Sequence, residues 1–90
     1  MNIPQIENMQ SAKGNDIANQ FRIFTDEGVF FQSYSSIIAF KPNSGKIVLD
    51  RDKWDYSVTT GKYRNRFLRE NKAETQRKID NGTYELADLN

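Results

Sequence analysis

The segment that most restricts the fold is Asp16 to Thr25, where successive side chains alternate between two faces of an extended chain. Ile17, Phe21 and Ile23 share one of these faces, and this period of two predicts a half-buried β-strand. Asp26-Glu27-Gly28 follows, and a short polar loop that ends in glycine suits a tight hairpin, because glycine readily adopts positive φ. The chain is therefore expected to build its sheet from hairpins that are local in sequence.

The return strand of this hairpin is Val29 to Tyr34, which is rich in aromatic and β-branched residues. The polar run Ser33–Ser36 interrupts it and indicates a bend or bulge, after which Ile37 to Lys41 forms a further strand. Pro42 to Gly45 is a strong turn signal, and Lys46 to Leu49 then completes a second hairpin.

The C-terminal third of the chain carries helical signals. Thr59 or Thr60 is expected to cap a helix over residues 60–71 by accepting a backbone N–H bond. Tyr63 and Phe67 lie one helical turn apart, so they can face the core together.

We expect this helical region to divide in two. Ala73 and Ile79 do not continue the apolar direction that the first helix sets, which places a break near Asn71. The second helix should end at Asn81-Gly82, a typical C-cap pair. The tail Tyr84–Leu89 is expected to return to the sheet as an edge strand or to lie across the core.

The predicted fold class is α+β: a small antiparallel sheet of two consecutive hairpins, three to five strands in all, packed against one or two C-terminal helices. Residues 16–90 form the single expected domain. Residues 1–15 hold few apolar anchors and contain Pro4, so we expect an irregular N-terminal arm. The residues expected in the core are Phe21, Ile23, Phe31, Ile38, Val48, Tyr63 and Phe67.

Composition excludes many enzyme classes, because the 90 residues include neither Cys nor His. A thiolate zinc site, an iron–sulfur cluster and a cysteine nucleophile are therefore ruled out, as is a histidine general base. Asp50, Asp52 and Asp55 do not fit a calcium loop, which needs glycine at its sixth position and glutamate at its twelfth. The sequence predicts a protein that is not an enzyme and has no catalytic residue, metal site or cofactor.

The net charge of +1 hides an asymmetry along the chain. The segment from Thr60 to Lys78 has seven basic and two acidic residues, a balance of +5. A solvated helix face is one interpretation, and an anion-contacting surface is the other. In the second interpretation, phosphates bind the basic side chains while an aromatic ring stacks on a base. The candidate nucleic-acid-binding residues are Lys62, Arg64, Arg66, Arg69, Arg77 and Lys78, with Trp54 and Tyr34 as the stacking rings.

Three strings of residues, Ala18–Phe21, Phe31–Tyr34 and Trp54–Ser57, resemble those of a family of small proteins of unknown function encoded by tailed phages and related mobile elements. The resemblance runs from about Gly14 to the C-terminus. It implies a phage-type origin and expression in the bacterial host cytoplasm, and it carries over no functional residue.

Two other functions compete with nucleic-acid binding. The first is a protein-binding accessory factor or an inhibitor of a host or defence enzyme, a role the resemblance suggests; a hairpin edge could extend a partner's sheet or pair with a second copy as a homodimer. The second is a minor virion component. No apolar run approaches the ~20 residues that span a bilayer, and the N-terminus lacks the pattern of a signal peptide, so we expect a cytoplasmic protein without membrane contact.

Overall fold

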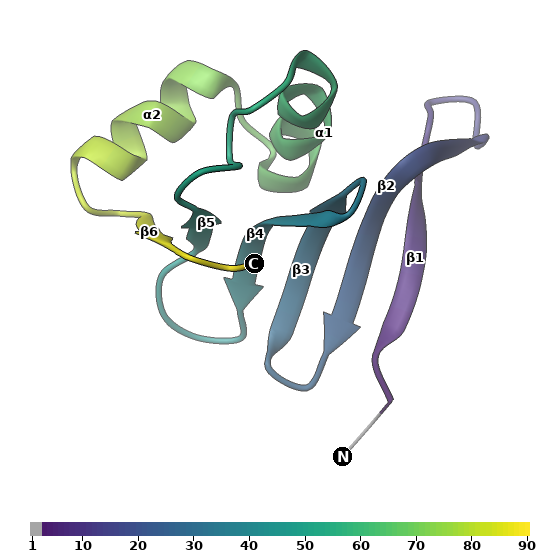
Figure 1. Cartoon of the computed structure of the whole chain (residues 1–90), viewed down its shortest axis with the longest axis horizontal. Coiled ribbons are helices and arrows are strands. Elements are labelled where there is room, and N and C mark those ends of the chain that lie inside the picture. The colour runs from purple at the N-terminus through teal and green to yellow at the C-terminus, as the bar shows by residue number, and fades with distance from the viewer. Residues whose placement is uncertain (1–2) are drawn as a thin grey trace.

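The computed structural model describes residues 3–90 and consists of a six-stranded sheet with two helices (Figure 1). The strands lie in the sheet in their order along the chain; every neighbouring pair is antiparallel except the last, which is parallel. The predicted α+β class is confirmed. The elements are β1 (Gln5–Gln10), β2 (Asp16–Thr25), β3 (Gly28–Ser33), β4 (Ser36–Pro42), β5 (Val48–Asp50), α1 (Val58–Leu68), α2 (Lys72–Asp80) and β6 (Glu85–Ala87).

The first predicted hairpin is confirmed as β2 and β3, with Phe24 opposite Val29 and Thr25 opposite Gly28. Gly28 has a φ of +150°, and a Cβ added there would lie 2.1 Å from the carbonyl oxygen of Lys41. Only glycine fits where β2 turns into β3 and β4 passes alongside.

The polar run Ser33–Ser36 is a tight turn and not the expected bend or bulge. Ser33 and Ser36 pair with each other, and Tyr34 occupies the left-handed region at a φ of +55°. The ladder between β3 and β4 does shift register, between Gln32, which pairs with Ile37, and Phe31, which pairs with Ala39. Pairing on both sides of the serines therefore produces a continuous meander from β1 to β5.

The expectation of an irregular arm over residues 1–15 was wrong, because it contains strand β1. Ile6 pairs with Ile23 and Asn8 with Phe21, and the side chain of Met9 is fully buried. The local sequence of this segment is polar and a weak strand former. Its strand conformation comes from the free hydrogen-bonding edge of β2, a long-range partner that local patterns do not report.

Helix α1 begins two residues earlier than expected. Ser57 is its N-cap, and the Ser57 hydroxyl accepts a hydrogen bond from the backbone N–H of Thr60 at 3.1 Å. Neither Thr59 nor Thr60 caps the helix; Thr60 is fully buried, with its hydroxyl 2.8 Å from that of Ser33. A threonine inside the helix therefore ties α1 to the end of β3.

The predicted break near Asn71 is confirmed. Helix α1 ends at Leu68 and is followed by its C-cap Arg69 in the left-handed conformation, and Asn71 caps α2 in a reciprocal capping box with Glu74. Helix α2 is followed by Asn81 and by Gly82, whose φ is positive. The tail then forms β6 at the edge of the sheet, one of the two placements expected for it.

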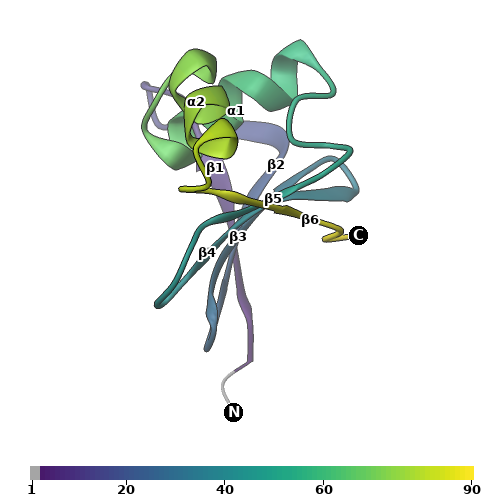
Figure 2. The same ribbon diagram turned by 90° about the vertical axis from the view of Figure 1, so that its left-hand side faces the viewer.

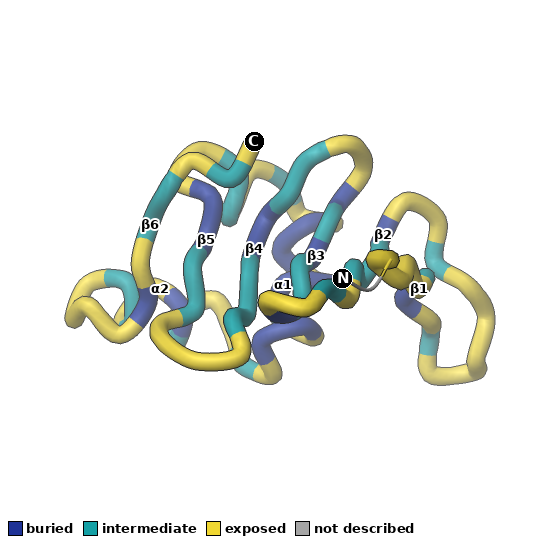
Figure 3. Tube along the Cα trace, turned by 90° about the horizontal axis from the view of Figure 1, so that it is seen from below, coloured by how far each residue is buried: buried dark blue, intermediate teal, exposed yellow. Residues whose placement is uncertain are grey.

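Both helices lie toward one end of the sheet and over one of its faces, while the β2–β3 hairpin tip projects away from them (Figure 2). Burial is concentrated in the central strands and α1 (Figure 3). Phe31 stacks on Phe67 with ring centroids 5.6 Å apart. The core residues are Met9, Phe31, Ile38, Ala39, Leu49, Tyr63, Phe67, Leu68 and Tyr84.

Four of the seven predicted core residues are confirmed: Phe31, Ile38, Tyr63 and Phe67 are buried. The prediction was wrong for Phe21, Ile23 and Val48, which are only partly buried. The sheet register places these three on the face opposite the helices, since Ile23 pairs with Phe30 and Val48 with Phe40. The alternation located their strands correctly but could not say which side of the sheet the helices cover.

Candidate functional site

Exposed basic side chains run along α1. Tyr63 and Phe67 turn toward the core, and the spacing of four and three residues leaves Lys62, Arg66 and Arg69 on the outer side of the helix. These three predicted residues therefore remain accessible, as the sequence interpretation requires.

The sheet adds two further cations beside the C-terminal half of α1. Arg22 of β2 and Lys41 of β4 border a cavity of about 300 Å³ together with Arg66 of α1 and Arg69, the C-cap residue of that helix. We call this cavity the basic cleft; its lining residues are Glu7, Arg22, Phe24, Val29, Lys41, Arg66, Phe67 and Arg69. Four cations face a single carboxylate there, so the electrostatics of the cleft favour an anion.

Lys41 is the cation of the basic cleft that is most affected by burial and by its charged neighbours. Its ammonium donates a hydrogen bond to the Phe67 carbonyl at the C-terminal end of α1 and lies 4.5 Å from the Phe67 ring centroid. Burial lowers the pKa of Lys41 below its ordinary value, and the nearby charges of Arg69 and Arg22 lower it further. A bound anion would relieve this repulsion.

A second hollow of about 400 Å³ continues the basic cleft toward the β1–β2 turn. The two hollows share Glu7, Arg22 and Arg66. Arg66 spans the boundary by donating a hydrogen bond to the Gln10 carbonyl at 2.6 Å, and Arg22 lies 3.5 Å from Glu7. Together the hollows extend from α1 to β1, with Arg22 and Arg66 bordering both of them.

An aromatic ring lies in the basic cleft beside its arginines. Phe24 is 37% exposed and borders the cavity with Arg22 and Arg69. Sequence reasoning missed Phe24, Arg22 and Lys41 because it looked for charge within one helix. The available signal was the alternation of the strand, which places Arg22 and Phe24 together on the face opposite Phe21 and Ile23.

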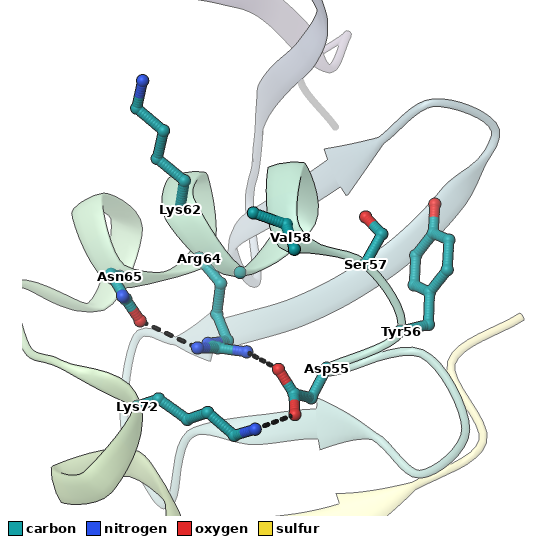
Figure 4. A pocket seen from close by; sticks show the side chains of 9 residues that line it. Asp55, Tyr56, Ser57, Val58, Lys62, Arg64, Asn65 and Lys72 are labelled. Carbon is teal, nitrogen blue, oxygen red and sulfur yellow. Dashed lines mark hydrogen bonds and ion pairs between the residues drawn. The ribbon is translucent and has the colours of Figure 1, made fainter.

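Arg64 must be removed from the predicted interface. Only 1% of its side chain is exposed, and its guanidinium donates a hydrogen bond to the Trp54 carbonyl at 2.7 Å. It also donates to the Asp55 carboxylate at 3.1 Å and to the Asn65 side chain at 2.8 Å (Figure 4). The prediction was wrong because Arg64 points inward from α1, where the domain's own acceptors hold it. A phosphate outside cannot reach this group.

Trp54 takes part in the same inward arrangement. Its partly buried ring packs against the core and lies 5.2 Å from the Arg64 guanidinium carbon. Tyr34 is exposed at the tip of the β3–β4 turn and does not line the basic cleft. Neither of the two predicted stacking rings therefore borders the cleft, where Phe24 lies instead.

Of the two remaining predicted cations, Lys78 contacts a carboxylate and Arg77 is exposed. Lys78 lies 2.6 Å from the Glu70 carboxylate, whose hydrogen bond raises the pKa of Lys78. Arg77 is exposed on α2 and does not line the basic cleft. The structure thus brings Arg66 and Arg69 together with the sheet cations and leaves Arg77 and Lys78 apart.

A larger hollow of about 630 Å³ lies at the N-terminal end of α1, where Asp55 is its central charge. Arg64 and Lys72 both contact this carboxylate, at 3.1 and 2.6 Å, while Lys62 points away from it (Figure 4). Burial would raise the pKa of Asp55, but its bonds to Lys72 and Arg64 outweigh this and hold the pKa below the ordinary value. Asp55 is therefore an ionised structural clamp and a poor proton donor.

Residues 3–90 contain no group of three or more carboxylates that could hold a metal ion. Over the same residues, neither helix has the length and apolar character needed to cross a bilayer.

Comparison with known proteins places the chain in a family. Residues 1–82 match the model of a family of unknown function, DUF8033. The chain belongs to this family. The match includes all of β1 to α2 and therefore both the basic cleft and the Asp55 clamp. No curated protein and no solved structure matches the chain.

Proposed function

We propose that this DUF8033 protein is a small, non-enzymatic nucleic-acid-binding module whose phosphate contacts lie in the basic cleft. The observation that carries the proposal is the convergence of Arg22 from β2, Lys41 from β4, and Arg66 and Arg69 from the C-terminal end of α1 and its cap on one cavity. Arginine donates two hydrogen bonds in a fixed fork that matches phosphate oxygens. A surface of this kind binds the backbone of nucleic acid without reading its sequence.

Phe24 favours a single strand over a duplex as the ligand. Its partly exposed ring lies among the arginines of the basic cleft, where an unpaired base can stack on it while neighbouring phosphates contact the guanidinium groups. Bases in a duplex are already stacked on each other and present no free face.

The overall balance of charge limits how strong this binding can be. The chain has a net charge of only +1, so attraction to nucleic acid is confined to the basic cleft and the exposed side of α1. As part of the same proposal, we infer a phage-type origin and a role in the bacterial host cytoplasm from the resemblance noted in the sequence.

The test is fluorescence anisotropy with labelled single-stranded DNA, single-stranded RNA and duplex DNA, each at low and moderate salt. We expect the single strands to bind more tightly than the duplex and to dissociate as salt rises, because phosphate contacts release counterions. With four cations engaged, log K should fall with log salt at a slope of about −3 for a single strand. No binding of any probe at low salt would end the proposal.

Two exposed arginines provide matched variants. Arg69→Glu reverses a charge inside the basic cleft, whereas Arg77→Glu makes the same change on α2 outside it. Arg69→Glu should weaken binding about tenfold and reduce the salt slope by about one, while Arg77→Glu should do neither. Equal losses for the two variants would place the contacts elsewhere.

A further inference from the structure

The face of the sheet opposite the helices carries an uninterrupted row of apolar side chains. The register joins Ile6 to Ile23, Ile23 to Phe30, Phe30 to Phe40 and Phe40 to Val48, one residue from each of the strands β1 to β5. We call these five residues the apolar row. The rings of Phe30 and Phe40 stack at its centre with centroids 4.3 Å apart. Neither helix covers this face (Figure 2).

The adjacent row on this face is uncharged as well. Asn8 pairs with Phe21, Phe21 with Gln32, and Gln32 with Ile37. Neither row contains a charged residue from β1 to β4, and Glu85 of β6 stands at the rim, opposite Val48. The helix-facing side differs, since it carries Glu7, Arg22 and Lys41 on the same strands.

A second copy of the chain is the occupant that fits this face. In a twofold-symmetric interface each residue meets the same surface of its partner, so any charge near the axis would face an identical charge. The apolar row meets this condition because it carries no charge, and the interior of homodimer interfaces is depleted in charge in the same way. A face without charge offers a charged partner nothing to pair with.

The area of the face is also sufficient. The six strands range from three to ten residues and average about six, so a spacing of about 4.8 Å and a rise of about 3.4 Å per residue give roughly 29 by 20 Å, or about 600 Å² for each copy. The total of about 1,200 Å² reaches the lower limit of stable protein–protein interfaces. The stacked phenylalanines at its centre supply the buried aromatic contact on which such interfaces depend.

We propose that two copies of this chain pack their open sheet faces together, forming a two-layer β-sandwich across a twofold axis near Phe30 and Phe40. The helices and the basic clefts then lie on the two outer sides of the dimer, one cleft on each. This proposal is independent of nucleic-acid binding, because it uses the opposite face of the sheet.

Sedimentation equilibrium of the full chain, freed of nucleic acid at high salt, tests the proposal. We expect a mass twice that of one chain. Phe40→Lys places a charge at the centre of the face and should halve the measured mass while the circular dichroism spectrum stays that of a folded protein. Val58→Lys is the matched control, because Val58 is 91% exposed on α1 and outside the face; it should stay dimeric.

Ile6→Glu keeps the test decisive should Phe40→Lys unfold. Ile6 is 70% exposed at the end of the apolar row, so the substitution leaves the packing of a single chain intact. It should raise the dissociation constant of the dimer about tenfold, the loss expected when an apolar contact becomes a buried charge. A wild-type protein that is monomeric at every concentration overturns the proposal. So does a folded Phe40→Lys variant that remains dimeric, which would indicate pairing through the edge of β1.

Discussion

The two faces of the sheet are built from the same strands yet differ in chemistry. Toward the helices, one cross-strand row starts with Glu7 and Arg22 and continues into Phe31, Ala39 and Leu49, which belong to the hydrophobic core. The opposite face presents the apolar row without a charge and without a covering layer. The helix-facing side is therefore part core and part basic cleft, whereas the open side carries the apolar row and, beside it, an uncharged row that includes Asn8 and Gln32.

This difference shows how a short chain divides its surface. The helices reach over only one end of the sheet, so the strands beyond them carry polar and cationic side chains on that side. The open face has no layer of its own, and its aromatic side chains stay partly exposed in a single chain. This exposed apolar face is the feature on which the proposed dimer rests.

The largest expected effect comes from truncating the helix-facing core. Phe67→Ala removes a ring that is 4% exposed and stacked on Phe31, and it should lower the free energy of unfolding by about 3–5 kcal/mol in a urea titration. Phe30→Ala on the open face should cost less than half as much, at concentrations too low for association. A loss under about 1 kcal/mol for Phe67→Ala would mean that this side is not the core.

Acid should loosen the helical layer through Glu70 and Asp55. Burial would raise the pKa of Glu70, but hydrogen bonds from Lys78, Thr75 and Tyr84 outweigh it and hold the pKa below its ordinary value, as the contacts of Asp55 do for that group. A carboxylate whose pKa is lower in the folded state than in the unfolded state stabilises the fold. This stabilisation is complete above the ordinary pKa, 4.5 for Glu70 and 3.8 for Asp55, and it is lost as the pH falls through the pKa of the folded state.

We therefore expect urea midpoints to drop below about pH 4, with amide exchange rising first in α1 and α2. Glu70→Gln should make the fall of the urea midpoint below about pH 4 less steep. Glu27→Gln serves as the control, because Glu27 is an exposed carboxylate in the β2–β3 loop; it should leave the fall of the urea midpoint unchanged. If the urea midpoint of Glu70→Gln falls with acid as steeply as that of the wild type, the hydrogen bonds of Glu70 do not have the stabilising role given to them.

The smallest expected effect is a gain in stability at Gln20. Its side chain is fully buried on the helix-facing side, and neither its amide nitrogen nor its amide oxygen has a hydrogen-bond partner among the described residues. Gln20→Met keeps the volume and removes the unpaired groups, so unfolding should become harder by about 1 kcal/mol. Thermal denaturation measures this, and a lower midpoint would mean that internal water satisfies the amide.

Local patterns were sufficient for most elements and not for β1. The alternation in Asp16–Thr25 and the Asn71 and Asn81-Gly82 signals act within a few residues, so they predicted a strand, a helix break and a helix end where the structure has them. Strand β1 has few such signals, because its conformation depends on pairing with β2. The expectation of a bend at Ser33–Ser36 failed for a similar reason, since only pairing across the turn distinguishes a hairpin.

The candidate site was likewise predicted only where local sequence patterns determine it. A helical spacing was enough to place Lys62, Arg66 and Arg69 on one exposed stripe, but it did not predict that Arg64 is buried. The inward position of Arg64 depends on acceptors in the loop before α1, including Asp55 and the Trp54 carbonyl. The strand alternation placed Arg22 on the face opposite Phe21 and Ile23, but its meeting with Lys41 depends on the pairing of different strands.

By itself, the sequence of this protein determined the α+β class, the hairpins after residue 16 and the two-helix C-terminal region, because hydrogen bonds within turns and helices join residues close along the chain. Only the tertiary structure decided which face of the sheet the helices cover, which arginine is buried and which cations meet. Those outcomes depend on contacts between residues far apart in sequence, where register and packing choose among side chains of the same chemical type.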